Sequence, residues 1–208
     1  RRHVVGDADT TTAMGVKAAR IAIERAGISK EEIDFIVFAT LSPDYYFPGP
    51  GVLVQEQLGI DNIGALDVRN QCSGFVYGLS VADQYIRTGT YKNILLIGSE
   101  LHSQGLDKST RGRGVTVIFG DGAAAVVLQP TEEEGKGLLT THLHSQGQFA
   151  KELAGLRSWD AAWSILPCLR MVGLTLRSTL ALPSAWAETV WPCSSTRWMT
   201  CVCSSRTT

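Results

Sequence analysis

Apolar residues in the first part of the chain follow two different spacings. Over Thr10–Arg25 they recur at helical spacing, Asp9 or Thr10 can cap the first turn, and Gly27 follows the last one. In contrast, Ile33–Thr40 is a nearly continuous apolar run, rich in β-branched and aromatic residues. This pattern predicts a helix followed by a strand that is buried on both faces.

The rest of residues 1–150 continues this alternation of helix and strand. The helix expected at Cys72–Thr88 has apolar residues around most of its circumference, so we expect it to be central and buried. Alternating elements followed by adjacent strands predict a layered α/β fold with a mixed, mostly parallel sheet around this helix. The other expected elements are a capping box at Ser29–Glu32, a helix at Val52–Leu58, a polar loop at Ser99–Gly114, buried strands at Ile63–Val68 and Asn93–Gly98, and strands at Ala123–Gln129 and Leu138–His144.

A change in composition divides the chain near residue 151. Residues 152–208 contain all five Trp, four of the five Cys and no Lys, and they keep no regular hydrophobic period. We therefore predict two parts: a structured half at 1–150 and an irregular tail at 151–208. Out-of-frame translation of a GC-rich gene would produce such a tail, and a genuine irregular segment is the alternative. Translation of the coding DNA in all three frames separates the two.

Charge and hydropathy exclude several classes of protein. With 19 Lys and Arg against 20 Asp and Glu, the chain lacks the excess of positive charge that favours binding to nucleic acid or to an anionic membrane. No apolar run approaches the roughly 20 residues that a membrane span needs. The chain starts at Arg1 without a signal peptide, and we interpret it as a fragment whose start lies upstream.

Two motifs are only weak indications of a binding site. Gly120–Ala125 fits a dinucleotide fingerprint only superficially, because a strand pattern follows it where that motif needs a helix. His142 and His144 share a face of an expected strand, but the sequence shows no third metal ligand. A tight turn and a structural pair of histidines are the simpler interpretations, and no metal or other cofactor is predicted.

Cys72 is the strongest candidate for chemistry. It lies between an expected strand and an expected buried helix, and with Asn70 as N-cap it falls in the first helical turn. In that position the helix dipole and free backbone N–H groups favour a thiolate. The alternative is an inert buried cysteine, and no acid–base partner lies nearby in the sequence.

Several segments together resemble β-ketoacyl-ACP synthase III, a condensing enzyme of the thiolase fold. The resemblance rests on segments that occur in the family's order: Ala39-Thr40 with Phe47-Pro48, Asp67–Tyr85 around Cys72, Val117–Val127 and Thr141–Ser145. It covers the larger part of the N-terminal half of such an enzyme. It implies a thiolase-like fold in which the first strand of the family would lie before Arg1.

The resemblance also implies a mechanism and roles for particular residues. An acyl-CoA starter would acylate Cys72, and malonyl-ACP would then condense with the acyl-enzyme to give a 3-oxoacyl-ACP, without a metal or redox cofactor. Phe47 would cross a dimer interface to wall the partner's acyl pocket, and Phe119 would line that pocket, with core packing as the alternative for both. Arg111 or Arg113 would contact the CoA nucleotide, and the alternative is a solvated loop.

The same resemblance indicates what is missing. Neither the His-Gln-Ala-Asn-type nor the Gly-Asn-Thr-type segment of the family occurs in the sequence, so we expect a truncated, inactive copy that self-associates or has low solubility. The full-length enzyme is expected to be a cytoplasmic homodimer that initiates fatty acid synthesis. Alternatives are another thiolase-fold condensing enzyme with a longer or specialised acyl starter, and a non-catalytic half-fold.

Overall fold

The structure, a computed structural model, describes residues 3–6, 8–70, 72–150 and 202–204. The chain divides into two compact units, which are described separately. The larger unit contains Arg1–Gln104, Gly120–Thr141 and Glu188–Thr208, and the smaller one contains Gly105–Phe119 and His142–Ala187. The predicted boundary between 1–150 and 151–208 lies at the edge of the described residues and stays a prediction.

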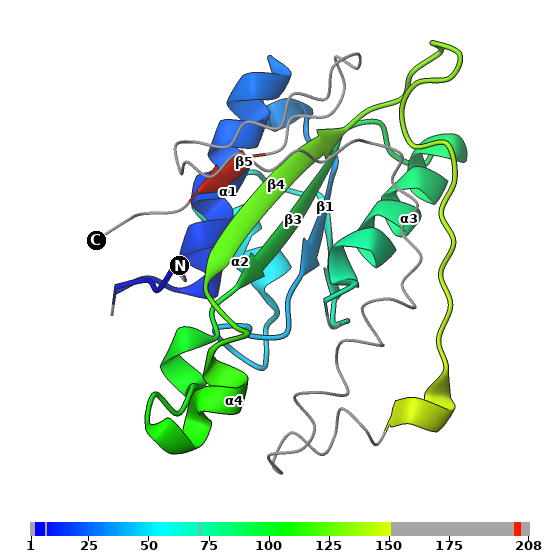
Figure 1. Ribbon diagram of the computed structural model, residues 1–208. Coiled ribbons are helices and arrows are strands. Elements are labelled where there is room, and N and C mark those ends of the chain that lie inside the picture. Colours follow the sequence, from blue (N-terminus) through cyan, green and yellow to red (C-terminus); the bar gives the residue numbers. More distant parts are fainter. Residues whose placement is uncertain (1–2, 7, 71, 151–201, 205–208) are drawn as a thin grey trace. The chain divides into compact units, whose positions relative to one another are not determined.

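A mixed sheet forms the centre of the larger unit (Figure 1). Its strands have the order β2-β1-β3-β4-β5. The strand β1 runs parallel to β2 and β3, whereas β4 is antiparallel to β3 and to β5. This arrangement confirms the predicted mixed α/β sheet. The bounds are β1 Phe35–Ala39, β2 Gly64–Val68, β3 Ile94–Glu100, β4 Gly122–Leu128 and β5 Val202–Ser204.

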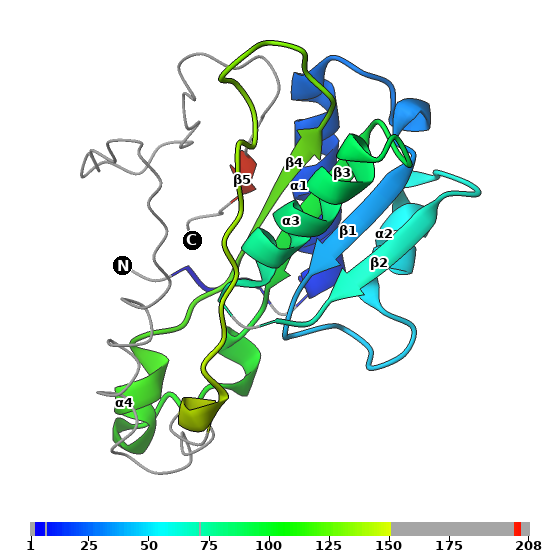
Figure 2. The ribbon, with the colours of Figure 1, turned by 90° about the vertical axis from the view of Figure 1, so that its right-hand side faces the viewer.

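Helices cover both faces of this sheet, as Figure 2 shows with α3 in front of the strands and α1 behind them. The helices α1 (Thr11–Ala26) and α2 (Pro50–Leu58) share one core with Ile36, Phe38, Leu95 and Ile97. The helix α3 (Gly74–Arg87) lies on the other face, against Phe35, Val37, Ile94 and Leu96. Successive strand residues point to opposite faces, so apolar residues at every position satisfy both cores.

Local signals fix the start of α1 and the ends of α1 and α2 as predicted. The Thr10 hydroxyl accepts a hydrogen bond from the N–H of Ala13 at 3.1 Å, and Gly27 ends α1 in the left-handed conformation with φ 70°. The N–H of Ser29 donates to the Glu32 carboxylate at 2.8 Å, which is one arm of the predicted capping box. Gly59 closes α2 with φ 65°.

The helix α3 is less buried than the sequence predicts. Among the described residues, only Gly74, Gly78 and Ala82 of this helix are buried. These three residues are spaced four apart and form one narrow stripe against the sheet, where Gly78 lets the helix approach Leu96 closely. The remaining apolar positions are largely half-buried, because the described residues cover this helix on the sheet side.

Two strand predictions need correction. The segment Leu138–His144 has no regular secondary structure, and Leu139 is largely exposed. Its apolar residues are too few to bury a face, and the carbonyl of Leu138 accepts a hydrogen bond from the Arg87 guanidinium instead of a ladder bond. The strand β2 does form, but at the edge of the sheet, so it is half-buried rather than buried.

The expected polar loop after β3 contains short helical turns. They are 3-10 turns at Ser103–Gly105 and Thr110–Gly112 and the short helix α4 at Arg113–Thr116, and a further 3-10 turn lies at Gly147–Phe149. Within the described part of the chain, every helix is too short or too polar to cross a bilayer.

Candidate active site

The candidate site lies where the three parallel strands end. Because β1, β2 and β3 run parallel, the segments after them start at the same edge of the sheet. Thr40–Asp44 follows β1, Arg69–Cys72 follows β2, and Leu101–Ser103 follows β3. Ligands of α/β proteins bind at this edge.

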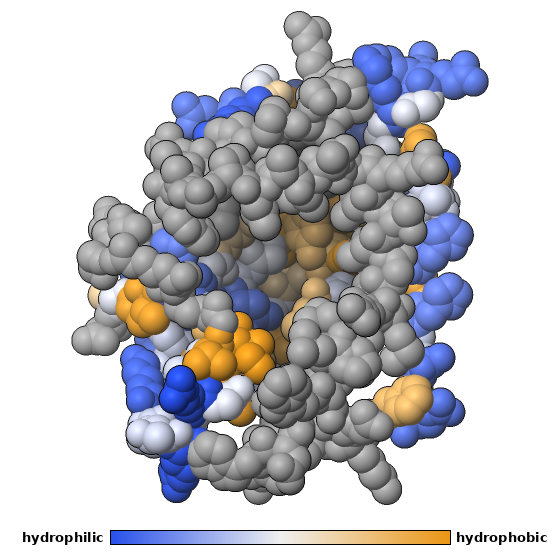
Figure 3. Space-filling model, in the orientation of Figure 1, coloured by the Kyte–Doolittle hydropathy of each residue, from blue (hydrophilic) through white to orange (hydrophobic). Residues whose placement is uncertain are grey.

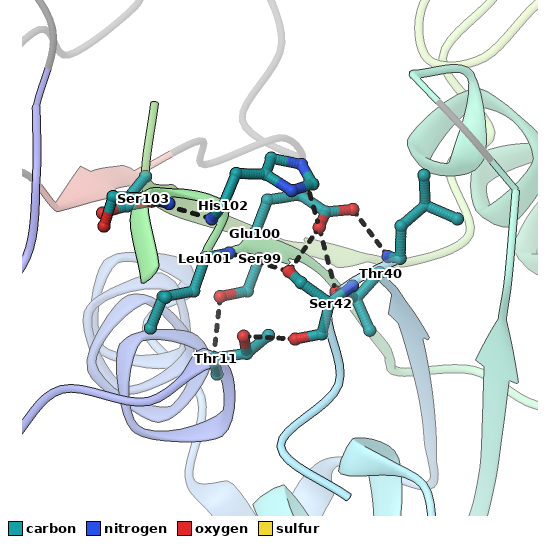
Figure 4. Close-up of polar contacts among 10 residues, drawn as sticks. Thr11, Thr40, Ser42, Ser99, Glu100, Leu101, His102 and Ser103 are labelled. Atoms are coloured by element: carbon teal, nitrogen blue, oxygen red, sulfur yellow. Dashed lines mark hydrogen bonds and ion pairs between the residues drawn. The ribbon is translucent and has the colours of Figure 1, made fainter. Parts of the chain in front are cut away.

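Glu100, at the end of β3, organises this edge (Figure 4). Its carboxylate accepts hydrogen bonds from the N–H of Leu41 at 2.7 Å and from the hydroxyls of Ser42 at 2.6 Å and Thr40 at 3.3 Å. The imidazole Nε2 of His102 lies 3.4 Å from the same carboxylate. The backbone after β1 is thereby tied to the end of β3.

The segment after β1 is also tied to α1. The Asp44 carboxylate accepts the N–H of Thr11 at 2.7 Å and the N–H of Thr12 at 2.9 Å. These first-turn donors have no partner within the helix, and a carboxylate at a helix N-terminus is electrostatically favourable. The Ser99 hydroxyl donates to the carbonyl of Thr11 at 2.8 Å in the interior, as Figure 4 also shows.

Asp121 joins the N-terminal segment of the chain to the segment that follows β3. It accepts the N–H groups of Val5 at 3.0 Å and of His102 and Ser103, both at 2.8 Å. Desolvation by burial raises the pKa of this carboxyl, but these hydrogen bonds and one from the Ser103 hydroxyl outweigh it and leave the pKa lowered.

Asp67 on β2 braces the loop between β1 and α2. Its carboxylate accepts the N–H of Gly51 at 2.8 Å, and burial raises its pKa more than this bond lowers it. A Cβ at Gly49 would overlap the same carboxylate, so the loop needs glycine at that position. This contact joins the loop that carries Phe47 to the strand that leads to Cys72.

Cys72 is a free, exposed thiol on the segment between β2 and α3. The residue that precedes α3 is Ser73, not the predicted Asn70, so Cys72 lies just before the helix rather than in its first turn. The shift follows from backbone geometry: the Ser73 carbonyl accepts from Val76 and Tyr77 and starts the helical pattern.

Phe47 belongs to an exposed aromatic group on the same unit. Phe47 and Tyr46 are each 89% exposed and Tyr45 is 61% exposed. The Arg69 guanidinium lies 6.0 Å from the centre of the Tyr46 ring, at the limit of a cation–π contact. Because 89% of Phe47 is exposed, it is not part of the core formed by the described residues, and the core-packing alternative is wrong for it.

The other three predicted site residues lie in the smaller unit. Arg111 is exposed and its Nε donates to the Asp107 carboxylate at 2.9 Å. Arg113 is exposed and begins α4, whereas Phe119 is half-buried. Cys72 and Phe47 therefore belong to the larger unit, and Arg111, Arg113 and Phe119 belong to the smaller one.

Residues 138–144 provide no metal site among the described residues. His142 and His144 are exposed and lie on an irregular segment, so the strand that was expected to align them is missing. Across the residues that the structure describes, no group of three or more His, Cys, Asp and Glu side chains is arranged to hold a metal ion.

Sequence reasoning missed the carboxylates that organise these loops. Glu100 and Asp107 were part of an undivided polar loop, and Asp121 was part of a glycine turn. For Glu100 a signal was present, because an acid directly after a buried parallel strand is placed at the functional edge of the sheet. For Asp107 and Asp121 the hydrogen bonds involve backbone N–H groups, which no side-chain pattern reveals.

Several apolar residues lie on the surface of the chain (Figure 3). The exposed large apolar residues among those described are Val4, Tyr45, Tyr46, Phe47, Val52, Val117, Ile118 and Leu139. Three of them are the consecutive aromatic residues 45–47. Adjacent exposed aromatic residues are typical of interaction surfaces.

Comparisons with known proteins show which enzymes the chain resembles. The family model of 3-oxoacyl-ACP synthase III matches residues 66–147, which include Cys72, both arginines and Phe119. The β-ketoacyl-ACP synthase III of Ehrlichia canis is 44% identical over 149 residues, which are 72% of this chain and 46% of that protein. Over the part that is matched, the chain is therefore similar to β-ketoacyl-ACP synthase III.

Solved structures of synthase III confirm the fold. The enzyme from Aquifex aeolicus is 41% identical, with a TM-score of 0.60 over 64% of this chain and 42% of that one. The enzyme from Thermus thermophilus is 31% identical, with a TM-score of 0.66 over 73% of this chain and 46% of that one. The thiolase-like α/β fold is thus established, and the chain spans about half the length of the synthase III relatives it matches.

Proposed function

We propose that the chain carries the acyl-accepting half of a 3-oxoacyl-ACP synthase III, with Cys72 as the nucleophile. One observation carries the proposal: a free, exposed thiol lies between β2 and α3, at the carboxyl edge of the parallel strands and inside the residues that match the family. Covalent catalysis needs such an accessible thiol on a rigid support.

The step is a thioester exchange. The Cys72 sulfur attacks the carbonyl carbon of an acyl-CoA, the bond from that carbon to the CoA sulfur breaks, and CoA leaves as the free thiol with the proton that Cys72 loses. In the complete reaction the acyl group would pass to the carbanion formed by decarboxylation of malonyl-ACP, which starts a fatty acid chain. We place this reaction in the cytoplasm, in a homodimer.

The remaining predicted residues have supporting roles in this proposal. Phe47, which the chain leaves exposed, would wall the acyl pocket of a second copy, and Phe119 would line the pocket. An arginine of the smaller unit, Arg111 or Arg113, would contact the phosphates of the nucleotide. Guanidinium groups suit phosphates because they donate planar, bidentate hydrogen bonds.

The test is intact-mass spectrometry of the full chain after incubation with acetyl-CoA. We expect one acetyl group per chain, which peptide mapping locates on Cys72. Cys72→Ala should take up none. The matched control replaces Cys168, Cys193, Cys201 and Cys203 by Ser and should keep the adduct. An adduct that survives in Cys72→Ala, or no adduct on folded protein, contradicts the proposal.

A further inference from the structure

Asp67 on β2 supplies the cap that α2 lacks in its own sequence. The N-cap of α2 is Gly49, which has no side chain, and the first helical residue is Pro50, which has no N–H. The first free donor of the helix is therefore the N–H of Gly51, and it donates to the Asp67 Oδ1 at 2.8 Å. A carboxylate is favoured at this end of a helix, although Asp67 lies 16 residues after Gly51 in the chain.

The second oxygen of the same carboxylate lies against Gly49. A Cβ at Gly49 would overlap this Oδ2, and the three described atoms nearest to that Cβ all belong to the Asp67 carboxyl. The backbone of Gly49 has φ −73° and ψ 163°, a conformation that any residue adopts. The close contact with Asp67, and not backbone strain, therefore excludes a side chain at position 49.

The loop held in this way presents Phe47 to the surface. Phe47 is 89% exposed, so packing among the described residues does not fix its ring. A second contact joins the same two parts of the chain, because the Arg69 guanidinium lies 6.0 Å from the centre of the Tyr46 ring. Asp67 and Arg69 lie on the stretch that leads from β2 to Cys72. The position of the Phe47 ring thus depends on the strand that leads to the candidate nucleophile.

We propose that Asp67 is a positioning residue, which holds the loop after β1 so that Phe47 limits the size of the acyl group that a second copy accepts. This inference rests on the proposed function, which gives Phe47 the role of a wall of the acyl pocket. It goes further by naming the residue that determines where this wall stands. Asp67, the loop and Phe47 all belong to the larger unit, and Asp67 acts through the loop without touching the acyl group.

Digestion of the full chain with chymotrypsin measures how firmly the loop is held. The readout is the initial rate of cleavage after Tyr45 and Tyr46, divided by the rate after Tyr91, which packs in an aromatic cluster of the core and reports global unfolding. Asp67→Ala should raise this cleavage ratio by about tenfold, as expected for the loss of a hydrogen bond to a charged acceptor. Asp67→Asn keeps an acceptor oxygen and should stay within about threefold of the unmodified chain.

The substitution Gly49→Ala is a stricter test, because its effect should depend on Asp67. In the unmodified chain the added methyl group meets the carboxylate and should raise the cleavage ratio by about tenfold. In the Asp67→Ala background the carboxylate is gone, so the same substitution should change the ratio by less than about twofold. The matched controls are Gly105→Ala, where a Cβ would meet no described residue within 4 Å, and Asp61→Ala, at an exposed acid. Both should leave the ratio unchanged.

Acyl selectivity shows whether the held loop matters for acyl transfer. It is measured as the ratio of the second-order rate constants for modification of Cys72 by hexanoyl-CoA and by acetyl-CoA. Phe47→Ala should raise this ratio by about tenfold, because it removes a wall of the pocket. Asp67→Ala should raise it by about threefold, because the wall is then misplaced. A loss of folded protein alone slows both reactions and leaves the ratio unmoved.

Three results would overturn the inference. The first is an unchanged cleavage ratio in Asp67→Ala, or a Gly49→Ala effect that is as large without the carboxylate as with it. The second is a change of acyl selectivity in Phe47→Ala that Asp67→Ala does not share, and the third is a selectivity that neither variant changes. Failure of the proposed function has a different signature, since the unmodified chain would then take up neither acyl group on Cys72, while the cleavage ratio would still respond to Asp67→Ala.

Discussion

Individual carboxylates hold the loops of this chain by binding backbone N–H groups. Asp44 accepts two N–H groups, Asp121 accepts three, and Glu100 accepts one together with two hydroxyls. A hydrogen bond to an ionised acceptor is stronger than a neutral one. Loops around the candidate site are thereby fixed without regular secondary structure.

Asp121→Asn should destabilise the chain, and more at neutral than at acidic pH. The amide has one acceptor oxygen, so it loses part of the contacts to Val5, His102 and Ser103. Because folding lowers the pKa of Asp121, its contribution is present above the unfolded pKa and is lost as pH falls through the folded one.

Urea unfolding at pH 7 and pH 3 measures this difference. The free energy of unfolding of Asp121→Asn should lie clearly below that of the unmodified chain at pH 7, with a smaller gap at pH 3. Asp61→Asn, which alters an exposed carboxyl, is the control. An equal loss at both pH values would refute the electrostatic explanation.

Phe47→Ala should leave stability unchanged but weaken self-association. The ring is 89% exposed, so its removal should alter the free energy of unfolding by no more than about 0.5 kcal/mol. If the ring inserts into a second copy, sedimentation velocity should show a shift toward monomer. Leu139→Ala, at another exposed apolar residue, should not cause this shift, and identical sedimentation of all three proteins would count against the dimer role.

At the scale of the elements, prediction succeeded where the signal is local. Caps and apolar runs located α1, α2, β1 and β3 to within two residues, because capping and strand burial depend on neighbouring residues. The burial of α3 and the edge position of β2 depend on what packs from elsewhere, which no local pattern contains. The strand predicted at Leu138–His144 is absent for the same reason. Without a neighbouring strand, its few apolar residues do not stabilise an extended conformation.

The site shows the same division. Cys72 was proposed from its position between a strand and a helix and from the family resemblance, and its role stays a prediction. The start of the helix was misplaced by a few residues. That error arose because Asn70 and Ser73 are both acceptable caps in sequence, and the backbone decides between them.

The substitution Gly78→Val tests how closely α3 packs against the sheet. A Cβ at this position would lie 2.6 Å from the Leu96 Cδ1 and 3.3 Å from the Val37 Cγ1. Overpacking there should cost about 1–3 kcal/mol of unfolding free energy, to which the β-branched side chain adds little. Gln84→Val, on the exposed side of the same helix, is the control for helix propensity. Equal melting curves for the two variants would show that α3 does not pack as described.

At the scale of the whole molecule, acylation of Cys72 and condensation with malonyl-ACP need different groups. Acylation needs an accessible thiol and a donor, and Cys72, within the family match, is an exposed free thiol. Condensation also needs groups that stabilise the charge that develops on malonyl-ACP and on the thioester oxygen. The four histidines of the chain are His3, His102, His142 and His144, and none is followed by Gln-Ala-Asn.

We therefore expect the chain to accumulate acetyl-Cys72 and to form no 3-oxoacyl-ACP. With acetyl-CoA and malonyl-ACP together, the acetyl adduct should persist on the protein, and mass spectrometry of the carrier should show malonyl-ACP unchanged. A full-length synthase III assayed in parallel is the positive control for the carrier. Formation of 3-oxobutyryl-ACP that depends on Cys72 would mean that residues of this chain supply the stabilising groups themselves. In that case His102 should be the first residue to be mutated. It lies with Glu100 at the edge of the sheet that carries the nucleophile.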